Sequence, residues 1–110
     1  MSLQEVRKLF ANKDHWIKGH YAKDAEGNYR DPSSPEAVRF CLVGGLDRCG
    51  ADNHESRKHV QDAIAELFPG RFLIGYDKPF IHLFNDDPEI THDDVLRVLD
   101  RAIEVSGDVT

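Results

Sequence analysis

Apolar residues repeat at helical spacing in several segments of the chain, and polar stretches separate these segments. The clearest segment begins with Thr91 as an N-cap, has Asp93 and Asp94 in its first turn, and ends at Gly107. Its apolar stripe consists of Val95, Leu96, Val98, Leu99, Ala102 and Ile103. This pattern predicts a long amphipathic helix.

Two other segments read as helices, and one region reads as short strands. Residues 2 to 12 open with a Ser-x-x-Glu capping box and carry an apolar face. A further helix is expected from Asn53 to the Pro69-Gly70 pair. The apolar segments 72 to 74 and 80 to 84 favour buried strands, although the second is also short enough to be one turn of buried helix.

Residues 14 to 34 lack a period and are rich in turn-forming residues. Within them, residues 21 to 24 and 28 to 30 could pair as a small hairpin around Gly27. Trp16 is expected to anchor this stretch, because a large indole ring rarely stays in water without a binding role. Loops of this length tend to be functional.

Another helix is expected to begin with Ser34 as its N-cap and Pro35 in its first turn, and to run to Arg48 or Cys49. Together these patterns predict a mainly α (α+β) fold with about four helices around one core and a small β-hairpin or two short strands. The length is that of a single compact domain over residues 1 to 110.

The stretch RFCLVGGL, residues 39 to 46, puts a cysteine and two glycines inside that expected helix. Cys41, Gly45 and Cys49 would lie along one helix face, and a stripe of small residues lets another helix or the Trp16 ring approach closely. Cys41 is therefore expected to be small and buried. A disulfide is not expected, because eight residues of continuous helix separate the two cysteines by about 12 Å.

A reactive Cys41 is the alternative. A thiolate nucleophile needs a lowered pKa, and two turns into a helix the dipole helps little. Its partners would be His82, followed by Asn85 or Asp86, in a Cys-His-Asn/Asp arrangement. This alternative predicts a thiol hydrolase or transferase that uses Cys41, His82 and Asp86.

Charge and composition exclude several classes of function. The net charge is −6, and residues 85 to 110 hold eight acidic side chains against two arginines. No basic cluster longer than Arg57-Lys58 occurs, so direct binding to nucleic acid is not expected. No apolar run reaches the roughly 20 residues of a membrane span and the chain opens without a signal-peptide pattern, which predicts a cytoplasmic protein.

No metal or cofactor is expected either. His15 and His20, like His54 and His59, are five residues apart, which on a helix separates them by about 140°. No zinc-type spacing and no glycine-rich phosphate loop occurs.

Three blocks of the sequence resemble one known family when they are taken together. They are HWIKGHYAKDAEGN at 15 to 28, DPSSPEAVRFCLVGGL at 31 to 46, and FNDDPEITHDDVLRVLDRAI at 84 to 103. The chain is similar to small bacterial and phage proteins of unknown function with a Trp-x-x-Gly start, an Ala-Val-Arg-aromatic-Cys-x-x-Gly-x-Leu helix and an Asn-Asp-x-Pro-x-x-Thr helix start. The resemblance implies a cytosolic context and no particular activity. It points to Trp16, Gly19, Asp24, Gly27, Arg39, Cys41, Gly44, Asn85 and Asp86.

The unusual residues lie outside the apolar helix stripes, which favours a binding function over an enzymatic one. We expect a pocket between Trp16, Arg39, Cys41, Asn85 and Asp86 that engages a protein or a small polar ligand. The acidic last helix could instead present carboxylates to a basic partner, although a solvated outer face is the more ordinary interpretation. The identity of the ligand and the oligomeric state do not follow from the sequence.

Overall fold

Five α-helices and a small sheet form the part of the chain that the computed structural model describes, residues 2–73 and 78–107. The elements are α1 (Leu3–Phe10), the 3-10 helix η1 (Lys13–His15), β1 (Ala22–Lys23), β2 (Arg39–Phe40), α2 (Leu42–Arg48), α3 (His54–Leu67), α4 (Ile81–Asp86) and α5 (His92–Ser106). The predicted mainly α (α+β) fold is thereby confirmed.

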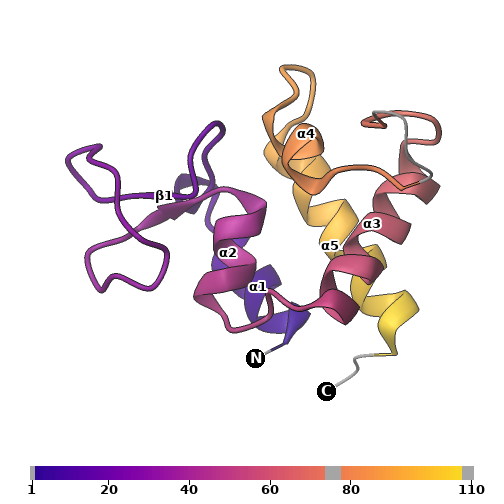
Figure 1. Ribbon diagram of the computed structural model, residues 1–110, viewed down its shortest axis with the longest axis horizontal. Coiled ribbons are helices and arrows are strands. Elements are labelled where there is room, and N and C mark those ends of the chain that lie inside the picture. Colours follow the sequence, from indigo (N-terminus) through magenta and orange to yellow (C-terminus); the bar gives the residue numbers. More distant parts are fainter. Residues whose placement is uncertain (1, 74–77, 108–110) are drawn as a thin grey trace.

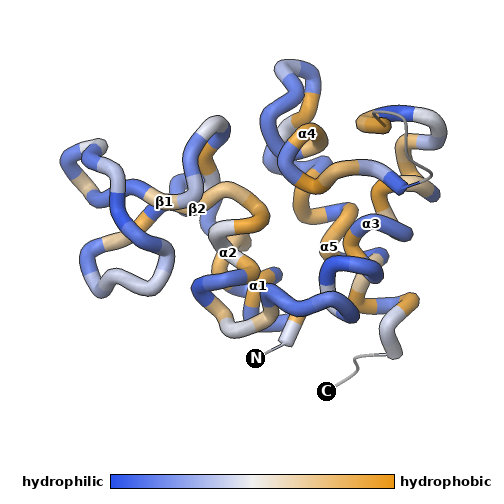
Figure 2. The backbone as a smooth tube through the Cα atoms, in the orientation of Figure 1, coloured by the Kyte–Doolittle hydropathy of each residue, from blue (hydrophilic) through white to orange (hydrophobic). Residues whose placement is uncertain are grey.

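The helices pack around one cluster of buried hydrophobic side chains. Helix α3 lies along α5, α1 packs against α2 and α5, and α4 packs against α2 and α3 (Figure 1). Figure 2 shows hydrophobic positions along these helices and mostly hydrophilic ones in the loop between β1 and β2. Within the described ranges, no helix combines the length and the apolar character that a membrane span requires.

Side-chain caps account for the helices that the sequence predicts correctly. Ser2 Oγ accepts a hydrogen bond from the Glu5 amide at 3.3 Å at the start of α1. Asn53 caps α3, and Thr91 caps α5 in a reciprocal capping box. Gly107 ends α5 in the left-handed conformation, which glycine adopts without a steric penalty. The predicted ranges of α1, α3 and α5 are therefore confirmed to within a few residues.

Helix α2 begins later than predicted, and its N-cap is Cys41 instead of Ser34. Ser34 caps only a turn, in which its Oγ accepts from the Glu36 amide at 3.2 Å. Residues 39–40 are extended because they pair antiparallel with β1, in the register Ala22 to Phe40. Strand pairing, which local sequence does not encode, overrides the helix-start signal at Ser34-Pro35.

The predicted hairpin around Gly27 is present, but its pairing is limited to one bridge and a turn. The Asp24 amide donates to the Asn28 carbonyl at 2.9 Å, and a single antiparallel bridge joins Lys23 to Tyr29. The strand that pairs with β1 over two residues is β2. The turn was therefore identified correctly, but the main partner of β1 comes from further along the chain.

The strand prediction for residues 80 to 84 is wrong, because this segment begins helix α4. Ile81, Phe84 and Asn85 are buried, which is the spacing of one helix face and not of a strand. Phe72 and Leu73 also form no strand, and Phe72 has a φ of 65°. The predicted strand residue Ile74 lies outside the described residues.

The two glycines of α2 are required by close packing. A Cβ at Gly44 would lie 1.9 Å from the Tyr21 carbonyl oxygen, and a Cβ at Gly45 would lie 2.4 Å from the Phe10 ring. Another helix, α1, therefore does approach Gly45, as the small residues predicted. The backbone at Tyr21 is in turn held against the start of α2.

Candidate functional site

Asn85 connects three segments that are far apart in the sequence. Its side chain is fully buried. Its Oδ1 accepts hydrogen bonds from Trp16 Nε1 at 2.7 Å and from the Leu42 amide at 3.0 Å. Its Nδ2 donates to the Ile17 carbonyl at 3.1 Å and to Asp86 Oδ1 at 2.9 Å. All four hydrogen-bonding positions of the amide are used, so Asn85 is a structural connector and has none left for a ligand.

Asp86 extends this connection to the next turn of the loop. Its Oδ1 also accepts from the Gly19 amide at 2.9 Å, where Gly19 has a φ of 87°. Nearby, Lys18 Nζ donates to the carbonyls of Asp87 and Ile90 at 2.6 and 2.8 Å. These bonds fix the loop after η1 against α4 and the turn that follows it.

A concave site, which we call the Cys41 recess, forms where this loop meets α2 and α4. Its volume is about 250 Å³. It is lined by Gly19, His20, Tyr21, Cys41, His82 and Asp86. The three residues of the predicted nucleophilic arrangement thus share one cavity.

The sequence predicts that Cys41 lies two turns inside a helix. The structure instead places it at the start of α2, as the N-cap. Its Sγ accepts a hydrogen bond from the Gly44 amide at 3.3 Å, and the residue is 6% exposed. Burial raises the pKa of the Cys41 thiol, and the nearby charge of Asp86 raises it further, against the lowering effect of the Gly44 and Val43 amides. The thiol is therefore held in its protonated form.

Cys41, His82 and Asp86 do not form a hydrogen-bonded relay. Among the described residues, no hydrogen bond joins His82 to Cys41 or to Asp86, and the His82 ring lies 5.7 Å from that of Phe80. A nucleophilic cysteine needs a base within hydrogen-bonding reach. The arrangement thus has the residue types of a Cys-His-Asp triad without its contacts.

Cys49 is the second cysteine, and both are free thiols. Cys49 is the C-cap of α2 and is half-buried, and burial raises the pKa of its thiol as well.

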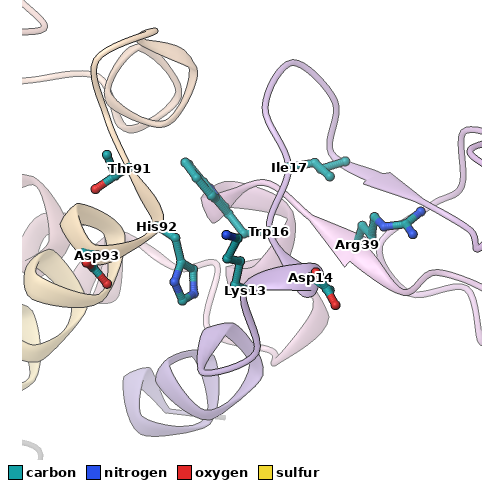
Figure 3. Close-up of a pocket in the computed structure, with 8 residues that line it drawn as sticks. All are labelled: Lys13, Asp14, Trp16, Ile17, Arg39, Thr91, His92 and Asp93. Carbon is teal, nitrogen blue, oxygen red and sulfur yellow. The ribbon is translucent and has the colours of Figure 1, made fainter.

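A second and larger cavity lies around Trp16, and we call it the Trp16 cavity. Its volume is about 540 Å³, and η1, β2 and the start of α5 contribute to it (Figure 3). The rings of Trp16 and His92 are 6.3 Å apart, and Lys18 Nζ lies 5.4 Å from the indole ring. Figure 3 shows the Arg39 side chain pointing away from both rings. The lining residues are Lys13, Asp14, Trp16, Ile17, Arg39, Thr91, His92 and Asp93.

The residues expected to share one pocket are thus distributed between two cavities. Trp16 and Arg39 line the Trp16 cavity, and Cys41 and Asp86 line the Cys41 recess, while Asn85 is buried. Sequence reasoning missed the contribution of residues 20 and 21, because neither position shows a local signal for a binding role.

Asp24 and Gly27, which the family resemblance also indicated, shape the loop after β1. The buried Asp24 carboxylate accepts from the amides of Glu26 and Asn28 at 3.0 and 2.9 Å and from Arg30 Nε at 2.8 Å. The Asn28 amide and Arg30 lower the pKa of Asp24, while its burial opposes them. Gly27 has a φ of 86° in the same turn. These two residues therefore maintain loop geometry.

Metal-binding geometry is absent from the part of the chain that the structure describes. No group of three or more His, Cys, Asp or Glu side chains there is placed to hold a metal ion. This holds for His20, Cys41, His82 and Asp86, although all four line the same recess.

Comparison with known proteins places the chain in an uncharacterised group, as its sequence pattern predicted. One family model, described as a family of unknown function (DUF6197), matches residues 2–105. Neither the curated proteins nor the solved structures gave a match.

Proposed function

The chain belongs to DUF6197, a family of unknown function, and we propose that it is a small cytosolic binding module without enzymatic activity. Its binding site is the Cys41 recess. The ligand is a small polar group, either a free molecule or part of a protein partner. Direct contact with nucleic acid or a membrane is not part of this function.

The observation that carries the proposal is a recess with fixed walls and accessible polar side chains. The loop wall is held by the bond from the Gly19 amide to Asp86 and by the bond from the Cys41 amide to the Tyr21 carbonyl at 3.3 Å. His82 and Asp86 are nevertheless exposed. A site whose walls are already ordered loses less entropy on binding, which favours affinity for a small ligand.

A fragment screen by ¹H-¹⁵N NMR tests the proposal. We expect small polar compounds to shift the amide signals of residues 19–21, 41 and 82. Asp86→Asn, which keeps the Oδ1 acceptor and removes the charge, should change these shifts. Asp93→Asn is the matched control, because it removes one exposed carboxylate from the Trp16 cavity. Hits confined to the Trp16 cavity, or none in the recess, would contradict the proposal.

A thiol hydrolase or transferase is the second candidate, because Cys41, His82 and Asp86 line one recess. It requires a rearrangement that brings His82 into contact with a deprotonated Cys41. Hydrolysis of p-nitrophenyl acetate by the wild type, Cys41→Ser and Cys49→Ser tests it. Turnover that is lost only in Cys41→Ser would support the enzyme and overturn the binding module.

The acidic side chains of α5 give little support to the alternative in which this helix binds a basic partner. Asp100 pairs with Arg7 of α1 at 2.8 Å, and Glu104 pairs with Arg101 at 3.6 Å. Arg101 also binds Glu66 of α3. Since these carboxylates have arginine partners within the molecule, we propose that this face is an ordinary solvated surface.

A further inference from the structure

We propose that the Cys41 recess recognises a small organic cation, whose guanidinium or ammonium group binds the carboxylate of Asp86. This inference rests on the proposed binding function and specifies the chemical class of its ligand.

The charge of Asp86 is not compensated by the protein. Among the described residues, no lysine or arginine lines the recess and no ion pair involves Asp86. The cations of the neighbouring loops are engaged elsewhere. Lys18 binds the carbonyls of Asp87 and Ile90, and Arg30 binds the carboxylates of Asp24 and Glu36. Asp86 therefore brings a negative charge without an ion-pair partner to the recess, and this charge attracts cations and repels anions.

The orientation of Asp86 leaves one oxygen for a ligand. Its Oδ1 accepts from the Gly19 amide and from Asn85 Nδ2, at 2.9 Å each. Its Oδ2 has no hydrogen bond to the described part of the protein. A carboxylate oxygen held in this way can accept from the N–H groups of a guanidinium or ammonium ion, and such charge-assisted bonds are among the strongest hydrogen bonds in proteins.

The other walls suit an organic cation better than a metal ion. Tyr21 is 62% exposed and lines the recess, so it offers a phenol ring that a cation can approach. The Cys41 thiol is neutral, because burial and the charge of Asp86 both raise its pKa. The side chains of the described recess do not converge in a metal-binding geometry. The volume of about 250 Å³ admits a small headgroup.

Methylguanidinium and methylurea are the probes that test this inference, because they have nearly the same shape and differ in charge. Both are titrated into the ¹⁵N-labelled full chain near neutral pH, with acetate as an anionic probe. We expect methylguanidinium to shift the amides of residues 19–21, 41 and 82 and to bind at least about tenfold more tightly than methylurea. Added sodium chloride should weaken its binding to the wild type.

Two variants test whether Asp86 is the carboxylate that binds methylguanidinium. Asp86→Asn should weaken methylguanidinium binding about tenfold or more, whereas Asp93→Asn should leave it unchanged. The salt titration of the wild type gives an independent answer if Asp86→Asn does not fold. Two further probes distinguish the source of the cation. Tighter binding of acetyl-Gly-Arg-Gly-amide than of agmatine indicates an arginine side chain of a protein, and the reverse order indicates a free small molecule.

The two proposals fail in different ways. If methylurea or acetate binds the recess as tightly as methylguanidinium, or if binding does not depend on salt, the cation class is wrong while the binding site stands. If methylguanidinium causes no shift in the recess, the cation inference is overturned. The fragment screen then decides whether the recess binds any ligand.

Discussion

At the scale of single residues, Asn85 joins the Trp16 loop to the start of α2. It satisfies the indole N–H of Trp16 and the amide of Leu42, which are otherwise without acceptors in the described structure. We predict that Asn85→Ala lowers the free energy of unfolding by about 3 kcal/mol, because it leaves buried donors unpaired. Urea unfolding followed by circular dichroism measures this loss.

The matched control for Asn85→Ala is Asn53→Ala. Asn53 is exposed and caps α3, so its replacement should cost only about 1 kcal/mol. Equal losses for the two variants would show that the buried connection contributes no more than an ordinary helix cap.

Asp24 gives a prediction on pH dependence. Its folded pKa lies below the ordinary value of 3.8, because the Asn28 amide and Arg30 stabilise the carboxylate. The stability that this carboxylate contributes is therefore present above pH 3.8 and is lost as pH falls through the lower folded value. We predict that wild type is more stable than Asp24→Asn at neutral pH and that the difference shrinks in acid. A difference in urea midpoint that is constant with pH would contradict this.

At the scale of elements, the glycines of α2 decide how closely the loop and α1 approach. We predict that Gly44→Ala lowers the free energy of unfolding by about 3 kcal/mol, because the added Cβ meets the backbone oxygen of Tyr21. Gly45→Ala should cost less, about 1 to 2 kcal/mol, since the Phe10 ring can shift.

Helix propensity acts in the opposite direction in both variants. Alanine is favoured over glycine in a helix by about 1 kcal/mol. Thermal unfolding of the two variants therefore gives a clear answer: a gain in stability at Gly44 would show that the packing against Tyr21 is loose.

Elements with their own caps could be predicted from sequence, and elements defined by contacts elsewhere could not. Thr91 and Asn53 start α5 and α3 as predicted, because the cap and the helix it begins are adjacent in the chain. The start of α2 was missed, since pairing with β1 extends residues 39–40. Residues 80 to 84, from which α4 begins, form a short and mostly apolar stretch, so the spacing of their apolar positions does not distinguish a strand from a helix.

The candidate site depends even more on distant contacts. The Trp16 to Asn85 bond and the Leu42 to Asn85 bond join segments 69 and 43 residues apart. The types of residue at Cys41, His82 and Asp86 could be read from the sequence as a possible chemistry. The burial of Cys41 was expected from its small size and is confirmed, but the relative orientation of the three side chains could not be predicted, because it arises only when these segments meet.

At the scale of the whole molecule, the chain should unfold in one step. The loop with Trp16 is bonded through Asn85 to α2 and α4, and α3 and α5 share the same core. Trp16 is the single tryptophan, so its fluorescence reports on this loop while circular dichroism reports on the helices. We predict that the two urea transitions coincide. A fluorescence transition at lower urea would show that the loop and the recess unfold separately.

We propose that the residues around Cys41 form a binding recess and not a catalytic centre. The most direct measurement is the rate of alkylation of Cys41 in the native protein against pH, read by peptide mass spectrometry with Cys49 as the internal reference. Because burial raises the pKa of Cys41, we predict slow reaction, slower than that of the half-buried Cys49, with a midpoint above the ordinary thiol value of about 8.5. Rapid reaction of Cys41 with a midpoint well below that value would contradict the account and identify a nucleophile.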